Sequence, residues 1–153
     1  MKLFVKIIVT FGLLFSFLSA EQNNNKNNLQ KYILQCDSGN ESSCDKLFFE
    51  YIKKKKYNKA AEIGWQNFYK GYYNTLPYMA DLLTTNKTKY KNCKLALLFL
   101  ESSIKLKKCV AFKILSNWYK EGRCTNKPDI KKSKKYYSFY KKCLNNKSKK
   151  NNK

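Results

Sequence analysis

Residues 111–137, AFKILSNWYKEGRCTNKPDIKKSKKYY, decide the fold class of this chain. Apolar side chains recur three and four positions apart at 112–119 and again at the end of the stretch, as on the buried face of a helix. Gly122 suits the left-handed residue that ends a helix, and Pro128 and Asp129 suit the start of the next one. The stretch therefore predicts two helices joined by a turn.

The same helical spacing continues through the central part of the chain. No segment shows the strict alternation of a half-buried strand, and the whole chain has only two prolines and five glycines. Apolar residues at helical spacing occupy seven segments: 29–36, 47–52, 60–68, 79–83, 95–104, 112–119 and 136–144. The sequence thus predicts an all-α domain over residues 29–144.

Two of the predicted helices align with each other. Residues 78–83 (YMADLL) match residues 114–119 (ILSNWY) at an offset of 36 residues, and each is followed by a polar turn and a second helix. A helix pair that recurs at this period is typical of α-solenoids, in which each hairpin buries its apolar face against its neighbours. We expect a short α-solenoid of about three antiparallel hairpins.

The first twenty residues predict a secretory signal peptide. Lys2 and Lys6 precede an apolar run at 7–17, and small residues lead to a cleavage position after Ala20. The alternative is an uncleaved anchor, but the run is shorter than the ~20 residues of a membrane-spanning helix. We therefore expect a secreted or periplasmic chain with no transmembrane segment after cleavage.

Two polar segments flank the predicted helical domain. Residues 21–28 are rich in asparagine, residues 145–153 are rich in asparagine and lysine, and neither segment offers an apolar side chain to bury. Such composition is typical of disordered segments. We expect a disordered linker at 21–28 and a disordered basic tail at 145–153.

An even number of cysteines in a short exported chain predicts a disulfide framework, because an oxidising compartment preserves the bonds. The chain has no C-x-x-C pair and no histidine, so neither a zinc site nor another cofactor is expected. The six cysteines are Cys36, Cys44, Cys93, Cys109, Cys124 and Cys143.

The net charge of +22 would attract anionic polymers such as cell-wall polysaccharide. The first twenty residues carry two lysines and no acid, so the remainder still has a charge of +20. Lysine also keeps a helical surface soluble, and the chain has a single arginine, Arg123, whereas nucleic-acid recognition favours arginine. Nucleic acid is therefore not the expected partner, and an anionic polymer remains an alternative that predicts strong salt dependence.

The stretch at 111–137 resembles the Sel-one-like repeat, a relative of the tetratricopeptide repeat. The matching residues are Leu115, Trp118, Tyr119, Gly122, Asp129, Lys132, Tyr136 and Tyr137. Ser116 stands where the repeat has a close-packing glycine, and Ser133 stands where it has alanine. The match is looser at 76–106 and looser still at 32–69. The resemblance implies an α-solenoid that binds proteins or peptides.

The sequence CDSGNESSC at 36–44 resembles the C-x7-C bridge of the Helicobacter cysteine-rich proteins, which are exported repeat proteins of this type. The resemblance implies a Cys36–Cys44 disulfide. At a later junction with the same spacing, Ile104 and Phe112 form an apolar pair where that family would have a bridge.

The geometry of antiparallel hairpins suggests the other two disulfide pairings, although the sequence leaves the connectivity beyond Cys36–Cys44 open. Cys109 and Cys143 would lie at the start of one helix and near the end of its partner, and Cys93 and Cys124 at the turn ends of adjacent hairpins. Joining Cys93 to Cys109 would have to cross more than ~15 Å of helix, beyond the ~6 Å that a bridge tolerates. We predict the bridges Cys93–Cys124 and Cys109–Cys143.

The predicted function is protein binding on the concave face, which the first helices of the hairpins would form. The candidate contacts on this face are Tyr78, Asp81, Asn117 and Lys120.

The alternative function is hydrolysis. The Helicobacter cysteine-rich family is associated with penicillin binding and β-lactamase activity, which would use a Ser-x-x-Lys pair. The chain offers Ser43/Lys46, Ser102/Lys105 and Ser138/Lys141, but about two such pairs are expected by chance at this lysine content. The absence of histidine excludes Ser-His-Asp and Cys-His catalysis, so we expect no catalytic residue.

Overall fold

The computed structural model describes residues 27–125 and 127–151, and every regular element in those ranges is a helix. The all-α prediction is therefore confirmed for the described part of the chain. Each of the seven predicted segments coincides with a helix: residues 27–37, α2 (Glu41–Lys53), α3 (Tyr57–Tyr69), α4 (Leu76–Leu82), α5 (Cys93–Lys105), α6 (Val110–Glu121) and α7 (Ile130–Asn151). The predicted signal peptide, residues 1–20, and residues 21–26 of the predicted linker lie outside the described ranges.

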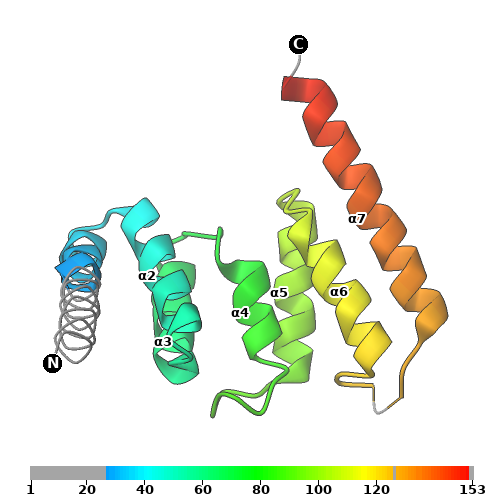
Figure 1. The fold of residues 1–153 in the computed structure, drawn as a ribbon, viewed down its shortest axis with the longest axis horizontal. Coiled ribbons are helices and arrows are strands. Elements are labelled where there is room, and N and C mark those ends of the chain that lie inside the picture. The colour runs from blue at the N-terminus through cyan, green and yellow to red at the C-terminus, as the bar shows by residue number, and fades with distance from the viewer. Residues whose placement is uncertain (1–26, 126, 152–153) are drawn as a thin grey trace, which may run out of the picture. The chain divides into compact units, whose positions relative to one another are not determined.

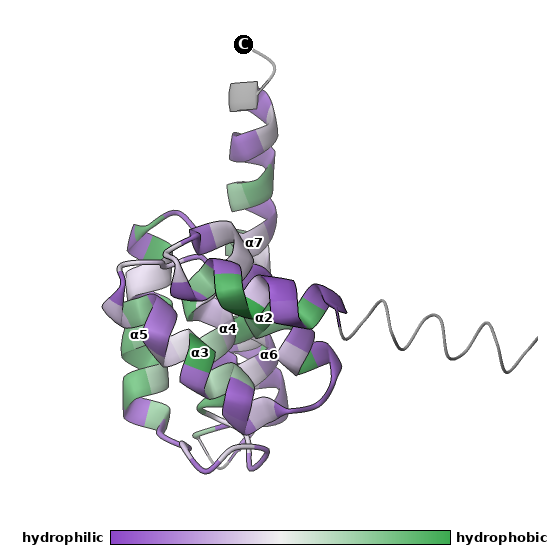
Figure 2. Cartoon of the chain, turned by 90° about the vertical axis from the view of Figure 1, so that its left-hand side faces the viewer, coloured by the Kyte–Doolittle hydropathy of each residue, from purple (hydrophilic) through white to green (hydrophobic). Residues whose placement is uncertain are grey.

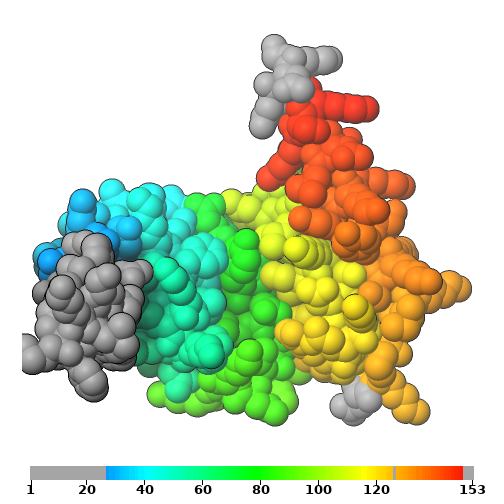
Figure 3. Space-filling view, viewed as in Figure 1, coloured from blue at the N-terminus to red at the C-terminus, as the bar shows by residue number. Residues whose placement is uncertain are grey.

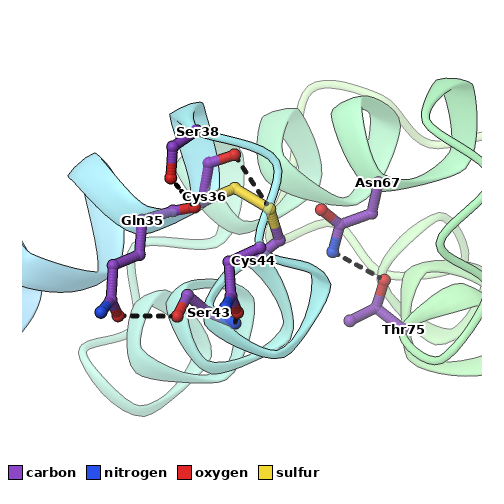
Figure 4. Close-up of a disulfide and its surroundings, with 8 residues drawn as sticks. Gln35, Cys36, Ser38, Ser43, Cys44, Asn67 and Thr75 are labelled. Atoms are coloured by element: carbon purple, nitrogen blue, oxygen red, sulfur yellow. Dashed lines mark hydrogen bonds between the residues drawn. A yellow bond between two sulfur atoms is a disulfide. The ribbon is translucent and has the colours of Figure 1, made fainter.

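The chain divides into two compact units, Met1–Leu47 and Phe48–Lys153. In the first unit, a disulfide joins Cys36 to Cys44, with the two Cα atoms 4.6 Å apart (Figure 4). The Asn40 side-chain oxygen accepts a hydrogen bond from the Ser43 backbone N–H at 2.9 Å, which is the arrangement of a helix N-cap. This cap explains why α2 begins where it does.

In the second unit, helices α3 to α7 follow one another in chain order (Figure 1). Each packs against the next, and α4 also contacts α6. The core of this unit includes Phe48, Met79, Leu83 and Leu100, whose side chains are almost completely buried. Hydrophobic residues cover much of α5 (Figure 2), as expected of a helix with neighbours on more than one side.

Local signals set the helix boundaries in this unit. The Asn92 side chain accepts a hydrogen bond from the Leu95 N–H at 3.0 Å and caps α5. Gly122 ends α6 with φ at +69°, as the sequence predicts. A Cβ on Gly122 would lie 2.8 Å from the backbone carbon of Lys127, so this turn requires glycine. Asp129 accepts from the Lys132 N–H at 2.8 Å and caps α7.

All six cysteines are paired in the described residues, and the pairing is the one predicted. Besides Cys36–Cys44, the structure contains Cys93–Cys124 and Cys109–Cys143, with Cα separations of 5.7 and 5.6 Å. No helix in the described ranges has both the length and the apolar character needed to span a bilayer.

The predicted ends of the helical domain differ from the structure. The first described helix begins at residue 27, within the predicted linker, and α7 continues to Asn151, through most of the segment expected to be a disordered tail. No glycine or proline follows Pro128, and lysine is a good helix former, so nothing in the sequence stops α7 near Leu144. Its last turns project beyond the rest of the unit (Figure 3).

Candidate functional site

Two of the four predicted contact residues lie on α4 and take part in packing. The Asp81 carboxylate forms an ion pair with Arg123, whose guanidinium nitrogen lies 2.7 Å from Oδ1. The Trp118 indole N–H donates to the same oxygen, with 3.4 Å between nitrogen and oxygen. The Tyr78 ring packs edge-on against Phe49, with centroids 4.9 Å apart. Asp81 therefore connects α4 to α6 and to the turn that follows it.

Replacing Asp81 by alanine is expected to lower the free energy of unfolding by less than about 1 kcal/mol, because the carboxylate is 41% exposed and the pair is screened by solvent. The difference from the wild-type chain should shrink further in 1 M NaCl, where the Debye length is about 3 Å. Urea denaturation at low and high salt measures both values. A loss above about 2 kcal/mol that persists in salt would show that Asp81 has a larger structural role.

The other two predicted contacts, Asn117 and Lys120, lie on α6 and line a groove of about 530 Å³ between α6 and α7. We call it the polar groove. Its lining residues are Ser116, Asn117, Lys120, Ile130, Ser133, Lys134, Tyr137, Ser138 and Lys141. The lysine ammonium groups and the Asn117 amide can bind carboxylates, phosphates or the carbonyl oxygens of a peptide.

The three Ser-x-x-Lys pairs lie in different surroundings. Ser43 is buried, and its hydroxyl donates to Gln35 Oε1 at 2.8 Å (Figure 4), while the Lys46 ammonium lies 5.7 Å from the centroid of the Tyr32 ring. The Ser43 hydroxyl is thus engaged with an amide.

Of the other two pairs, Ser138 and Lys141 both line the polar groove, and the Lys141 ammonium lies 5.2 Å from the centre of the Tyr137 ring. Ser102 lies exposed on α5. The described residues contain no cluster of three or more Cys, Asp or Glu side chains that could hold a metal ion.

A second groove, of about 850 Å³, lies at the opposite end of the α6–α7 pair, where α6 begins. We call it the apolar groove. Its lining includes Ile104, Phe112, Phe139 and the Cys143 half of a disulfide, which we call its apolar floor. Four lysines and one amide complete the lining: Lys107, Lys142, Asn146, Lys147 and Lys149.

Sequence reasoning noted the Ile104/Phe112 pair but missed the apolar groove. The groove also includes Phe139, which lies on α7, 27 positions after Phe112. Only the packing of α7 against α6 brings these two residues together. The one hint of this groove in the sequence was the Ile104/Phe112 pair. Two apolar residues that stand at a helix junction in place of a disulfide leave apolar surface that another group must cover.

Aromatic side chains pack between α6 and α7, and one of the two pairs, Phe112 with Phe139, also lines the apolar groove. The Tyr119 and Tyr136 rings stack with centroids 5.4 Å apart, and Phe112 and Phe139 meet edge-on at 5.8 Å. Partial burial raises the pKa of the Tyr136 phenol above its ordinary value of 10.0, and the neighbouring Tyr119 and Glu101 act in the same direction. α6 and α7 are therefore packed against each other and line both grooves.

The structure thus brings Asn117 and Lys120 together with Ser138 and Lys141 in one groove. It places Tyr78 and Asp81 in contacts with other parts of the fold. The apolar groove carries the larger open surface, and none of the four predicted contacts lines it. Comparison with known proteins found no matching family model, no matching curated protein and no matching solved structure.

Proposed function

We propose that this chain is an exported, disulfide-bonded α-solenoid, similar to the Sel-one-like repeat proteins, that binds other proteins. Its second unit would consist of stacked antiparallel hairpins, α4 with α5 and α6 with α7, preceded by α3. Binding rather than catalysis is proposed because the described surface offers grooves lined by lysine, amide and apolar groups, which suit recognition of peptide segments.

The contact between alternate helices is the observation that carries the proposal. α4 reaches α6 through Asp81, Trp118 and Arg123. In a row of stacked hairpins, the first helices of neighbouring hairpins touch one another, and so do the second helices. This pattern is what a solenoid requires and what an isolated helical bundle does not.

A corresponding contact joins α3 and α5, which would be the second helices of neighbouring hairpins. α3 reaches α5 through Trp65 and Phe68, whose ring centroids lie 5.6 and 5.0 Å from that of Phe99. The 36-residue offset between the aligned segments at 78–83 and 114–119, which lie on or beside α4 and α6, agrees with such a repeat.

The disulfides support export. All six cysteines are bridged, and structural disulfides in a chain of this size are typical of oxidising compartments outside the cytosol. Partners of the chain would then be found in the periplasm or outside the cell.

The proposal is tested by cross-linking in the exported fraction of the producing cells. A tagged chain with its disulfides intact is compared with the double variant Asn117→Ala/Lys120→Ala and with a matched control, Lys94→Ala/Lys113→Ala, whose lysines are also exposed on helices. We expect the wild-type chain to bind a protein partner saturably. The control should keep this binding, and the Asn117→Ala/Lys120→Ala variant should lose it or bind with at least about fivefold lower affinity.

Two results would contradict this function. One is the recovery of no saturable protein partner by the folded chain. The other is binding only to anionic polysaccharide with an affinity that falls steeply between about 50 and 200 mM salt, which is the behaviour of simple charge attraction. Turnover of a chromogenic β-lactam that is abolished by Ser138→Ala would instead support the hydrolase alternative.

A further inference from the structure

The apolar groove is an open surface with a preformed shape. The side chain of Phe139 is 36% exposed, although it packs against Phe112. The Cys109–Cys143 disulfide joins the start of α6 to the second half of α7 beside the groove, which fixes its two walls relative to each other. Within the described part of the second unit, α6 is the one helix that packs against α7, and the last turns of α7 project from it (Figure 3). The floor is therefore held in place without being covered.

The charge around this floor has a single sign. Lys107, Lys142, Lys147 and Lys149 are four of the nine lining residues, about twice the share of lysine in the whole chain, and no acidic side chain lines the groove. An occupant must therefore supply negative charge at its edges as well as apolar groups at its centre.

We propose that the apolar groove binds an acidic amphipathic helix of a partner protein. Such a helix carries apolar side chains at i, i+3, i+4 and i+7 on one face and Asp or Glu beside them, so that its apolar face would cover Ile104, Phe112 and Phe139 while its acids meet the lysines. Six of the nine lining residues lie on α7 between Phe139 and Lys149, a stretch of about three helical turns that a second helix could pack along.

Its volume of about 850 Å³ is large enough for several side chains, since typical binding pockets measure about 300–1,000 Å³. The polar groove does not offer the same chemistry, because serine, asparagine and lysine make up most of its lining. The inference rests on the proposed function, that the chain binds proteins, and adds the place and the chemical class of the partner segment.

The test uses a synthetic probe. A fluorescent helical peptide of about 14 residues, or about 21 Å of helix, carries leucine and phenylalanine on one face and glutamate on both sides of it. Fluorescence anisotropy measures its affinity for the disulfide-bonded chain. A second peptide has each glutamate replaced by lysine, and a third has the same composition in scrambled order.

Two variants of the chain change the groove at exposed positions, so that folding is expected to survive. Lys142→Glu/Lys147→Glu reverses the rim charge, and Phe139→Ser removes part of the floor. The matched control, Lys94→Glu/Lys131→Glu, makes the same change in net charge at two exposed lysines that line neither groove. Near-ultraviolet circular dichroism checks that each variant keeps its packing.

We expect both groove variants to lower the affinity for the acidic peptide at least tenfold, and the control to lower it less than about threefold. Equal weakening by the groove charge variant and the control would overturn the proposal, because the attraction would then be general. Binding of the scrambled peptide with the same affinity would also overturn it. So would Phe139-dependent binding to phosphatidylglycerol vesicles with no peptide binding, since the groove would then recognise a lipid surface.

The two proposals can fail separately. If cross-linking recovers a saturable partner whose binding is unchanged by Lys142→Glu/Lys147→Glu and by Phe139→Ser, the chain binds proteins but not through the apolar groove. If no partner is recovered and the acidic peptide binds no better than the scrambled one, both proposals fail.

Discussion

Replacing Cys109 and Cys143 together by alanine is expected to lower the free energy of unfolding by about 4 kcal/mol. The bridge closes a loop with a sequence separation of 34, and the entropy that such a cross-link removes from the unfolded chain grows with loop length. Small domains have a total stability of only about 5–15 kcal/mol, so this loss would remove between about a quarter and four fifths of it.

The same bridge also holds the second half of α7 against the rest of the unit. Ser133 near the start of the helix is buried, whereas the described side chains from Leu144 to Lys149 are all exposed. Beyond Phe139, the disulfide joins α7 to the residue before α6, and the Lys113 ammonium lies 5.8 Å from the centroid of the Tyr140 ring. Without the disulfide, hydrogen exchange in the second half of α7 should accelerate more than exchange in α4.

Urea denaturation and hydrogen exchange measure these two effects. The matched control exchanges two exposed serines of α7, Ser138 and Ser148, for alanine and should change the free energy of unfolding by no more than about 0.5 kcal/mol. A loss below about 1 kcal/mol in the cysteine variant would mean that aromatic packing alone holds α7. The acidic peptide should also bind this variant more weakly, because the walls of the apolar groove would no longer be fixed.

The helices and the disulfide pairing could be predicted because both depend on information along the chain. Helical spacing of apolar residues is local, and residues such as Asn92 and Gly122 mark helix ends without reference to other helices. The bridges Cys93–Cys124 and Cys109–Cys143 were suggested by the length of the helices, which limits which cysteines can come close, whereas Cys36–Cys44 was implied by the resemblance to the Helicobacter cysteine-rich proteins. The end of α7 was predicted wrongly because polar composition indicates that a segment has nothing to bury, not that its backbone cannot be helical.

Contacts between helices could not be predicted from one sequence. Ser116 and Ser133 were noted separately as departures from the repeat pattern, but in the structure they are buried against each other, and the Ser116 hydroxyl donates to the Ser133 carbonyl at 2.9 Å. The Asp81–Arg123 pair likewise joins positions 42 residues apart. Asp81 was predicted to bind a partner from its position on the face of its own helix. That position does not reveal that Trp118 of α6 lies against it.

The close packing of α3 against α4 depends on Gly64. A Cβ at this position would lie 2.7 Å from the Met79 sulfur and 3.2 Å from a ring carbon of Phe48. Glycine costs a helix interior about 1 kcal/mol relative to alanine, so its presence in the middle of α3 is explained by the space it leaves for Met79. Gly64→Leu is therefore expected to lower the free energy of unfolding by about 3 kcal/mol through overpacking.

A double-mutant cycle tests whether this contact is the cause. Met79→Ala alone should cost about 2–5 kcal/mol, because Met79 is fully buried and its removal leaves a cavity. If the introduced leucine side chain fills that cavity, the variant Gly64→Leu/Met79→Ala should be more stable than the sum of the single losses predicts, by at least about 1 kcal/mol. Gln66→Leu, which adds leucine at an exposed position of α3, serves as the control and should stay within about 0.5 kcal/mol of the wild-type chain.

Additive losses would show that Gly64 is required for a reason other than its contact with Met79. A coupling of the expected size would show that the distance between α3 and α4 is set by this one pair.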